Sequence, residues 1–349
     1  MLARCLTNVV IAGVSFVGAC ALISSLLPLP EIEPFSSKLR FYRAHRAEID
    51  TLFVGSSRIY QQISPVLFDE ETLAGRTPTH AFNLGMNGML LSEEDYLLEQ
   101  ILPESRGKLR WVFIELESLP LGFDPNNMAS KRIGYWHDWT RTQTIFRKIF
   151  RWDEKGKRKA TPDIILGSAK QKRRHRLFIL HLSLFARQSV NLGRFQDVAD
   201  WWTHRGTAPD ATLLGPARDG YHPVESHLAA NRRADYEQAL RAAMTTAEPK
   251  VLDSYTEETC RHSAEIVRRS GAIPVFIVPP VLNQSPLVFR GSVPAPGATL
   301  CFNNALRYPG LYRVAVRADP LHLNRTGSTE FSQAIGRDFV AALRAGVIR

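Results

Sequence analysis

The sequence predicts an α/β protein, a doubly wound sandwich around a mainly parallel sheet, preceded by one membrane-spanning helix. Short apolar runs rich in β-branched and aromatic residues alternate with helical stretches, as in a parallel sheet. A long uncharged segment opens the chain. The 349 residues, 44% hydrophobic and 22% charged, have the composition of a globular protein that can bury a sizeable core, which excludes a disordered or fibrous chain.

The N-terminus predicts a membrane anchor. Between Arg4 and Glu31 lie 26 residues without a formal charge, enough to cross a hydrocarbon layer of about 30 Å as a helix. We predict an anchor over residues 1–30, ahead of a cleaved signal peptide as the main alternative and a lipoprotein cleavage box at 17–20 as the third. One basic residue precedes the segment and four follow it closely, so charge counting alone mildly opposes export of the following domain.

The next part of the chain, residues 31–349, is predicted to be one α/β domain. Four runs have the pattern of buried parallel strands, and a weaker fifth follows near the C-terminus: Thr51 to Val54, Ala81 to Leu84, Trp111 to Leu116, Ile273 to Val278 and Tyr312 to Val316. Helices are predicted over Tyr96 to Leu102, after a capping box at Ser92 to Asp95, and over Thr256 to Arg269 and Gly327 to Leu343. Ligands of such sheets bind at the carboxyl ends of the strands.

A helical insertion at about 121–253 interrupts the alternation, and it carries the positive charge of the chain. The span Lys131 to Arg176 has fifteen Lys or Arg against four acidic residues, whereas the whole chain has a net charge of +10. Within it, Thr144 to Trp152 has a basic amphipathic pattern. This pattern predicts either a helix lying on anionic lipid headgroups or a lid helix with a solvated basic face. A polyanion such as an acidic polysaccharide is the expected partner, and no motif supports nucleic acid.

The loop after the first strand offers a candidate nucleophile. Gly55-Ser56-Ser57-Arg58 is a turn of small residues at the carboxyl end of a buried strand, where a serine hydroxyl can face the ligand crevice. The alternative is a tight strand-to-helix turn in which a serine only caps the helix. Arg58 could hold a substrate carboxylate or the loop itself.

A nucleophilic serine needs a base, and His322 is the candidate. Asp319 stands three residues before it and can orient the imidazole within one turn. The same spacing occurs at Asp219 and His222, but that copy lies in the irregular insertion, whereas Asp319 follows the predicted fifth strand and precedes the predicted C-terminal helix. We therefore assign the triad to Ser57, His322 and Asp319.

A tetrahedral intermediate also needs hydrogen-bond donors. The segment after the second strand, Asn83 to Gly88, contains glycines that permit close backbone approach and a side-chain amide at Asn87. A plain strand-ending turn would explain the glycines equally well.

These three loops, in this order, resemble the SGNH hydrolase-like superfamily, in particular its membrane-anchored branch related to D-alanine-transfer and polysaccharide O-acetylation proteins. Gly55-Ser56-Ser57-Arg58 is similar to the first motif of the family, Asn83-Leu84-Gly85 to the second, and Asp319-x-x-His322 to the last. The resemblance implies a three-layer α/β/α sandwich with a flavodoxin-like sheet, Ser57 as the nucleophile and Gly85 as an oxyanion amide. It also implies a domain on the periplasmic side of a bacterial inner membrane.

Two departures from the family pattern concern chemistry. Ser56 replaces the usual Asp before the nucleophile, and Glu115-Leu116-Glu117-Ser118 replaces a third motif whose Asn completes the oxyanion hole. The expected function is a serine acyltransferase or esterase acting on acyl esters of a cell-envelope or extracellular polysaccharide. A membrane-bound O-acyltransferase is a candidate partner by the same resemblance. The alternative is a non-catalytic accessory subunit that binds glycan or docks such an enzyme.

The cysteines predict no metal site, since no CxxC pair or metal-like spacing with His occurs. No metal and no cofactor are expected. Cys260 and Cys301 could form a disulfide in an exported domain, and two buried thiols are at least as well supported.

Overall fold

The computed structural model describes residues 2–349 except 106, 124, 129, 151–165, 205, 246–248, 283–286 and 292–293. The chain forms two compact units. The anchor unit comprises Met1–Ile32 and Leu121–Thr207, and the sheet unit comprises Glu33–Pro120 and Ala208–Arg349. The segment expected as one insertion at 121–253 is thus divided at residue 207, and its second part belongs with the sheet.

The sheet unit is mixed α/β and contains a five-stranded sheet in which every pairing is parallel. Its strands, in chain order, are β1 (Thr51–Val54), β2 (Ala81–Asn83), β3 (Trp111–Glu115), β5 (Ile273–Val278) and β7 (Ala298–Cys301). The first four confirm the predicted strands to within one residue. A second, two-stranded sheet pairs β4 (Lys250–Val251) with β6 (Leu287–Val288).

The predicted fifth strand at Tyr312 to Val316 is wrong. Those residues lie in two 3-10 helices, Pro309–Tyr312 and Val314–Val316. The Tyr312 hydroxyl donates to the Phe302 carbonyl at 2.9 Å, and Asn324 Nδ2 donates to the Ala315 carbonyl at 2.8 Å, so side-chain contacts hold this segment in a tight, non-extended form. The real fifth strand, β7, is short and includes the polar Thr299, and it follows a stretch rich in proline and glycine that resembles a loop.

The strand order β2-β1-β3-β5-β7 reverses direction between β1 and β3. In register, Thr51 pairs with Trp111 and Val54 with Ile114, so the carboxyl ends of β1 and β3 are level. A parallel sheet binds ligands at such a reversal, because the loops leaving the two strands diverge there. The loops after Val54 and Glu115 therefore define the expected site.

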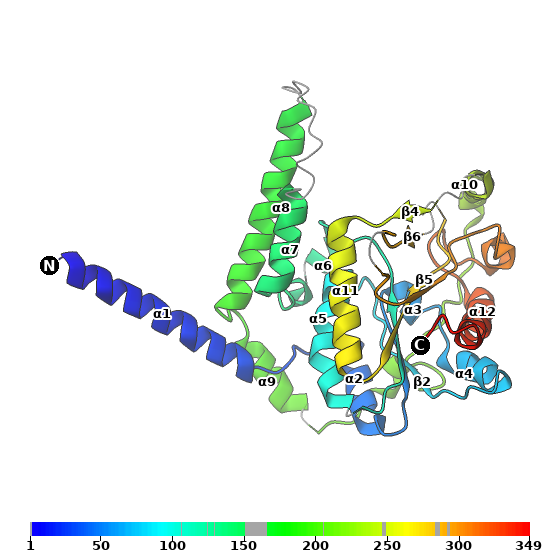
Figure 1. Ribbon diagram of the computed structural model, residues 1–349, viewed down its shortest axis with the longest axis horizontal. Helices are drawn as coiled ribbons and strands as arrows, with labels where there is room; N and C mark the ends of the chain where they lie inside the picture. Colours follow the sequence, from blue (N-terminus) through cyan, green and yellow to red (C-terminus); the bar gives the residue numbers. More distant parts are fainter. Residues whose placement is uncertain are drawn as a thin grey trace. The chain divides into compact units, whose positions relative to one another are not determined.

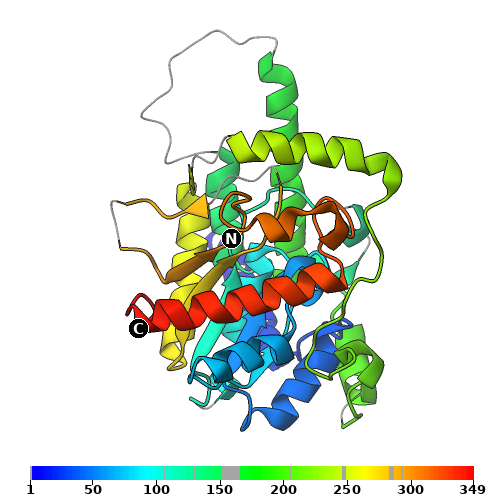
Figure 2. The ribbon, with the colours of Figure 1, turned by 90° about the vertical axis from the view of Figure 1, so that its right-hand side faces the viewer.

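Two pairs of long helices pack in the sheet unit. Helix α4 (Pro65–Ala74) lies alongside α12 (Arg325–Arg344), as Figure 2 shows, and α5 (Leu91–Ile101) lies alongside α11 (Ser254–Arg269) (Figure 1). Helix α5 begins five residues earlier than predicted. The N-cap is Leu90, so Ser92 lies inside the first turn, and Glu93 rather than Asp95 accepts the N-cap amide, at 3.4 Å. The predicted capping box from Ser92 to Asp95 is therefore wrong.

Phenylalanines join the sheet to α4 and α12. Phe53 of β1 stacks on Phe113 of β3 with ring centroids 4.5 Å apart, and Phe68 and Phe339 pack edge-on or tilted against them. All four side chains are fully buried. Burial of one such ring stabilises the fold by about 1.5–3 kcal/mol.

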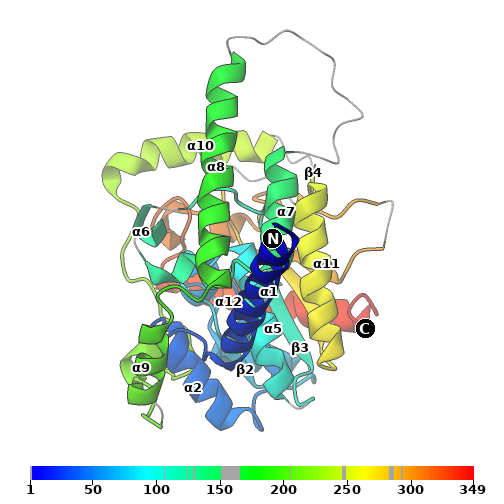
Figure 3. The same ribbon diagram turned by 90° about the vertical axis from the view of Figure 1, so that its left-hand side faces the viewer.

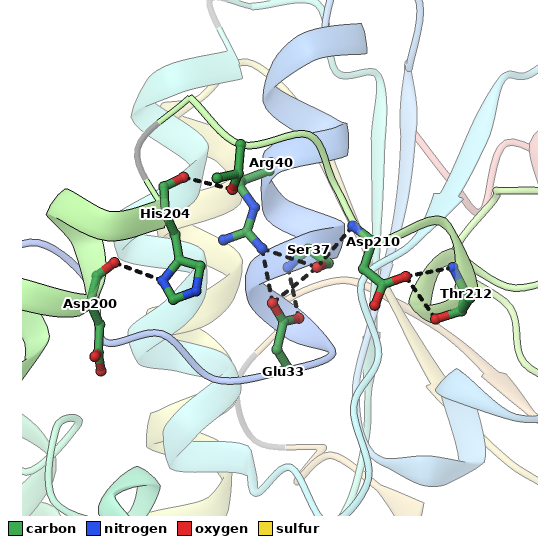
Figure 4. Close-up of polar contacts among 8 residues, drawn as sticks. Glu33, Ser37, Arg40, Asp200, His204, Asp210 and Thr212 are labelled. Atoms are coloured by element: carbon green, nitrogen blue, oxygen red, sulfur yellow. Dashed lines mark hydrogen bonds and ion pairs between the residues drawn. The ribbon is translucent and has the colours of Figure 1, made fainter.

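The chain enters the sheet unit twice, at Glu33 and at Ala208, and hydrogen bonds join the two entry segments. Helix α2 (Phe35–His45) follows Glu33, whose carboxylate accepts the Ser37 amide and hydroxyl at 3.1 and 3.0 Å and the Arg40 guanidinium at 2.9 Å. The Asp210 amide, at the second crossing, donates to the Ser37 hydroxyl at 3.3 Å (Figure 4). Asp210 then caps the 3-10 helix Ala211–Leu214 through Thr212.

The anchor unit is helical in its described part. Helix α1 (Leu2–Leu26) contains the one helical segment of the described chain that is long and apolar enough to cross a membrane, Arg4–Leu26. Helices α7 (Trp139–Phe150) and α8 (Leu166–Ser189) run side by side (Figures 1 and 3), with Phe146 and Phe150 against Phe178. Short α6 (Pro125–Met128) precedes them, and α9 (Phe195–His204) follows.

The packing of α7 bears on the predicted amphipathic segment Thr144 to Trp152. Ile145 and Ile149 are buried, and Phe146 and Phe150 are half-buried, so protein covers part of the apolar side of α7. Residues 151 and 152 and the basic run 155–159 lie outside the described residues. Cys260 and Cys301 are free thiols, so the disulfide alternative is not realised.

Candidate active site

The nucleophile loop leaves the carboxyl end of β1. Ser56 is the N-cap of the short helix α3 (Ser57–Tyr60), and its hydroxyl accepts the Arg58 amide at 3.3 Å. Ser57 is the first helical residue, so the capping role and the contact with His322 belong to two different serines. A Cβ at Gly55 would lie 2.3 Å from Ile59 Cγ1 and 2.7 Å from Glu115 Cβ, which is why only glycine fits there.

The three predicted triad residues come together with hydrogen-bond geometry. Ser57 Oγ lies 2.8 Å from His322 Nε2, and His322 Nδ1 lies 2.8 Å from Asp319 Oδ2. Oδ1 of Asp319 accepts the backbone amides of Leu321 and His322 at 2.7 and 2.9 Å. Asp319 is therefore fixed by its own turn, and the imidazole nitrogen that it accepts from is held as N–H, which leaves Nε2 able to take a proton from Ser57.

Electrostatics keep Asp319 ionised. Partial burial alone would raise its pKa, but the hydrogen bond and charge of His322 and the two backbone amides outweigh burial, and the net pKa lies below the usual value for Asp. An ionised Asp319 can stabilise an imidazolium formed at His322.

Arg317 holds the loop that presents His322. Its guanidinium is fully buried and donates to the carbonyls of Pro280 at 2.9 Å and Pro320 at 2.8 Å, and it lies over the rings of Tyr236 and Tyr312. After the loop, Asn324 caps α12 through the Gly327 amide at 3.1 Å. Arg317 and Asn324 therefore clamp the two ends of the Asp319–His322 turn.

The second Asp-x-x-His copy serves β2. The Asp219 carbonyl accepts the Asn83 amide at 2.8 Å, and the His222 amide donates to the Tyr60 carbonyl at 3.1 Å. Gly220 has φ +86° and passes so close to Asn83 that a Cβ would lie 2.0 Å from its carbonyl oxygen. This turn covers the outer edge of β2, and its histidine is not the one within reach of Ser57.

The predicted oxyanion residues lie on the loop after β2, which is joined to the nucleophile loop by the Met86 amide donating to the Gly55 carbonyl at 2.9 Å. The Gly85 amide already donates to Asn83 Oδ1 at 2.9 Å. A Cβ at Gly85 would lie 2.6 Å from the Tyr60 amide nitrogen, so this glycine permits close packing on α3. The Asn87 side chain is exposed on the same loop.

Lys38 supports this loop from beneath. It is fully buried in α2, its Nζ donates to the Gly85 carbonyl at 2.6 Å, and it lies 3.9 Å from the centroid of the Tyr60 ring. Burial lowers the pKa of Lys38 well below its ordinary value, and the charge of Asp219 offsets part of that effect. The sequence shows Lys38 only as one of the charges that follow the anchor.

Glu115, at the end of β3, fixes the nucleophile loop from the other side. Its fully buried carboxylate accepts the Ser56 amide at 2.6 Å and pairs with Arg58 Nε at 2.6 Å. Arg58 also pairs with Glu117 at 2.5 Å. Of the two roles predicted for Arg58, the structure shows the one that holds the loop. A charged residue ending an apolar strand was the signal in the sequence that could have identified Glu115.

Three carboxylates gather around the single guanidinium of Arg58. Burial raises the pKa of Glu117 to about 7, with Arg58 opposing the shift and Glu115 adding to it. Glu94 of α5 is fully buried, and burial followed by the charges of Glu115 and Glu117 raises its pKa well above the ordinary value. Within the described residues neither Glu94 oxygen has a hydrogen-bond partner, which disfavours the ionised form in the same direction as the raised pKa.

No group of three or more His, Cys, Asp or Glu side chains within the described ranges is arranged to hold a metal ion. No protein-family model matches the chain, and no curated protein matches it in sequence.

Proposed function

We propose that this chain is a membrane-anchored, SGNH-type serine acyltransferase or esterase that acts on acyl esters of a cell-envelope or extracellular polysaccharide. The observation that carries the proposal is the continuous hydrogen-bonded chain Ser57, His322, Asp319, at 2.8 Å for each link. Its position at the reversal of strand order supports the same conclusion, as do the two helix pairs expected of a three-layer sandwich. The catalytic unit would face the periplasm of a bacterial inner membrane, with α1 as the anchor.

In the first half-reaction, Ser57 Oγ attacks the carbonyl carbon of the acyl ester while His322 Nε2 takes the hydroxyl proton. The tetrahedral intermediate collapses, the bond to the alcohol breaks, and His322 returns the proton to the leaving oxygen. The products are an acyl ester on Ser57 and a free alcohol.

In the second half-reaction, a glycan hydroxyl or a water molecule gives its proton to His322 and attacks the acyl carbon. Collapse restores the Ser57 hydroxyl and releases the new ester or the free acid. The backbone amide of Ser57 and the side chain of Asn87 are the donors that we assign to the oxyanion. The Gly85 amide joins them only if its bond to Asn83 opens.

Labelling of the serine nucleophile tests the proposal, with the adjacent serine as a matched control. A fluorophosphonate probe should label the wild type and the variant Ser56→Ala, which loses a helix cap costing about 1 kcal/mol. It should not label Ser57→Ala. Labelling that survives in Ser57→Ala would refute Ser57 as the nucleophile, and loss in both variants with folding intact would refute the division of roles between the two serines.

A second function is supported by two observations. The Gly85 amide is used within its own loop, and the segment Glu115 to Ser118 has no Asn where the third motif of the SGNH family has an oxyanion Asn. A crevice of this kind would suit a non-catalytic accessory subunit that binds glycan or docks a membrane-bound O-acyltransferase. Purified chain that neither hydrolyses p-nitrophenyl acetate nor forms an acyl intermediate, yet co-purifies with such an enzyme, would favour this function.

A further inference from the structure

The corner between α8 and α9 in the anchor unit carries a group of exposed apolar side chains. We call it the aromatic corner, and it consists of Leu192, Phe195, Val198, Trp201 and Trp202. Phe195 is 85% exposed and Trp202 69%. Residues 195, 198 and 202 recur at helical spacing, so they form one stripe along α9.

The one buried residue of α9 is acidic, and no apolar residue of this helix is buried. Asp197 is only 3% exposed and pairs with the Arg194 guanidinium just before the helix. A surface helix in water normally buries its apolar stripe. The apolar stripe of α9 is instead exposed, together with polar side chains such as Gln196 and Thr203, so the stripe is available to an apolar partner.

Hydrogen bonds place the corner at the C-terminal end of α1. Asn191 Nδ2 donates to the Cys20 carbonyl at 2.8 Å, and the Ser24 hydroxyl donates to Asn191 Oδ1 at 2.9 Å. Arg194 Nη2 donates to the Pro28 carbonyl at 2.7 Å. The segment 191–194, which begins the corner, is therefore fixed against the last turns of the apolar helix and the residues just after it.

The length of α1 sets the depth of this junction. Its apolar segment has 23 residues, which at 1.5 Å per residue spans about 35 Å, slightly more than a hydrocarbon layer of about 30 Å. If Arg4 lies at one surface of the bilayer, the other surface falls near residue 24, so residues 20–28 lie within about 6 Å of that surface. Side chains attached there reach the headgroup level, where tryptophan and other aromatic residues are enriched.

We propose that the aromatic corner inserts into the interfacial layer of the same bilayer that α1 crosses. Its partner is the lipid surface, bound through apolar contact rather than through charge, since α9 carries Asp197 and Asp200 and no Lys or Arg. The proposal rests on α1 spanning the membrane. A corner held in this way would fix the orientation of the anchor unit relative to the bilayer.

Fluorescence quenching by lipid tests the insertion in the full chain. The chain is reconstituted into phosphatidylcholine nanodiscs with or without lipid bearing a doxyl group at carbon 5 of the acyl chain. We expect the doxyl lipid to quench part of the tryptophan emission in the wild type. The double variant Trp201→Phe, Trp202→Phe should lose most of the quenched component, because it removes the reporters and keeps aromatic rings in place.

Two further variants control this result. Trp111→Phe removes a tryptophan that is 4% exposed in the sheet unit, and it should leave the size of the quenched component unchanged. Phe195→Asp places a charge in the corner and should reduce quenching of the tryptophans that remain. Unchanged quenching in the double variant would overturn the proposal. Quenching of the tryptophan emission by acrylamide would then show whether water reaches these rings or whether protein covers them.

The premise about α1 is checked separately. Sodium carbonate at alkaline pH should leave the wild-type chain in the membrane fraction, because a spanning helix resists extraction. Release of the chain would refute the membrane span itself. Retention together with absent doxyl quenching would refute only the aromatic corner.

Discussion

The segments Asp219–His222 and Asp319–His322 have the same spacing and begin with the same local turn, yet they lie in different surroundings. In each, the first carboxylate oxygen accepts the amide two residues later, at 3.1 Å from Tyr221 and at 2.7 Å from Leu321. They differ in the second oxygen. That of Asp319 accepts the imidazole of its own histidine, whereas that of Asp219 faces the Val66 amide at 3.5 Å.

The residue after each aspartate explains the divergence. Gly220 adopts φ +86°, which proline cannot, while Pro320 fixes φ near −65° and keeps the chain in a tight turn that brings His322 back onto Asp319. His222 instead passes over α3, with its ring centroid 5.9 Å from that of Tyr60. The comparison shows that the Asp-x-x-His spacing produces a turn. The residue after the aspartate and the neighbouring segments decide whether the histidine lies against a serine, as His322 does, or the turn packs on an edge strand, as the Asp219 turn does.

Replacing each histidine by alanine should give the largest contrast between the two copies. His322→Ala removes the base and should lower kcat/KM for p-nitrophenyl acetate by about 10³-fold or more. His222→Ala should change it by less than about threefold, which is under about 0.7 kcal/mol. Esterase assays on both variants, with melting curves as a folding control, measure this. A similar loss in both variants would show that His222 takes part in turnover.

Replacing the residue after each aspartate should affect stability rather than activity, and the larger effect should now come from the Asp219 copy. Gly220→Ala forces a left-handed φ on alanine and drives its Cβ into the Asn83 carbonyl, so we expect a loss of about 3 kcal/mol or more. Pro320→Ala relaxes only the unfolded chain and should cost less than about 1 kcal/mol. Urea unfolding followed by circular dichroism measures both. A Gly220→Ala variant as stable as the wild type would mean that the β2 edge turn is not tightly packed.

Much of the fold could be predicted because its strands are buried on both faces. Thr51–Val54 and Ile273–Val278 are short apolar runs without a polar break, and the structure gives these bounds without change. The fifth strand could not be found in the same way. β7 has a mixed composition and is half-exposed at the edge of the sheet. The segment at Tyr312 has the apolar composition of a strand because it packs in the core, although its backbone is not extended. The division of the chain at residue 207 also left no mark in composition.

In the site, the sequence indicated the residues that belong to local patterns but not those that support them. Ser57 and His322 could be predicted because a serine after a buried strand and an Asp-x-x-His turn are local patterns. Lys38, Glu115 and Arg317 act over long range, through contacts with Gly85, Ser56 and the Pro280 carbonyl. A buried charge has the same letter as a solvated one, so only the packing of distant segments distinguishes them.

The smallest predicted contrast concerns the pH dependence of stability, since the two aspartates shift in opposite directions. Burial raises the pKa of Asp219, against hydrogen bonds from Tyr221 and Val66 and the charge of Lys38, whereas the pKa of Asp319 is lowered. A raised pKa means that the folded state holds its proton more tightly, so the contribution of Asp219 is present below pH about 3.8 and is lost as pH rises through its folded pKa. The contribution of Asp319 is present above pH about 3.8 and is lost as pH falls through its folded pKa.

The substitutions Asp219→Asn and Asp319→Asn isolate these contributions, because asparagine keeps the oxygen that accepts the turn amides and cannot ionise. Thermal unfolding between pH 3 and 7 should show the melting temperature of Asp219→Asn rising relative to the wild type as pH increases. For Asp319→Asn the difference should move the other way, and the variant should be least stable relative to the wild type near neutral pH, where the ionised wild-type carboxylate holds the imidazole. Parallel pH profiles for the two variants would contradict the opposite shifts, and the two turns would then differ in their neighbours but not in the state of their carboxylates.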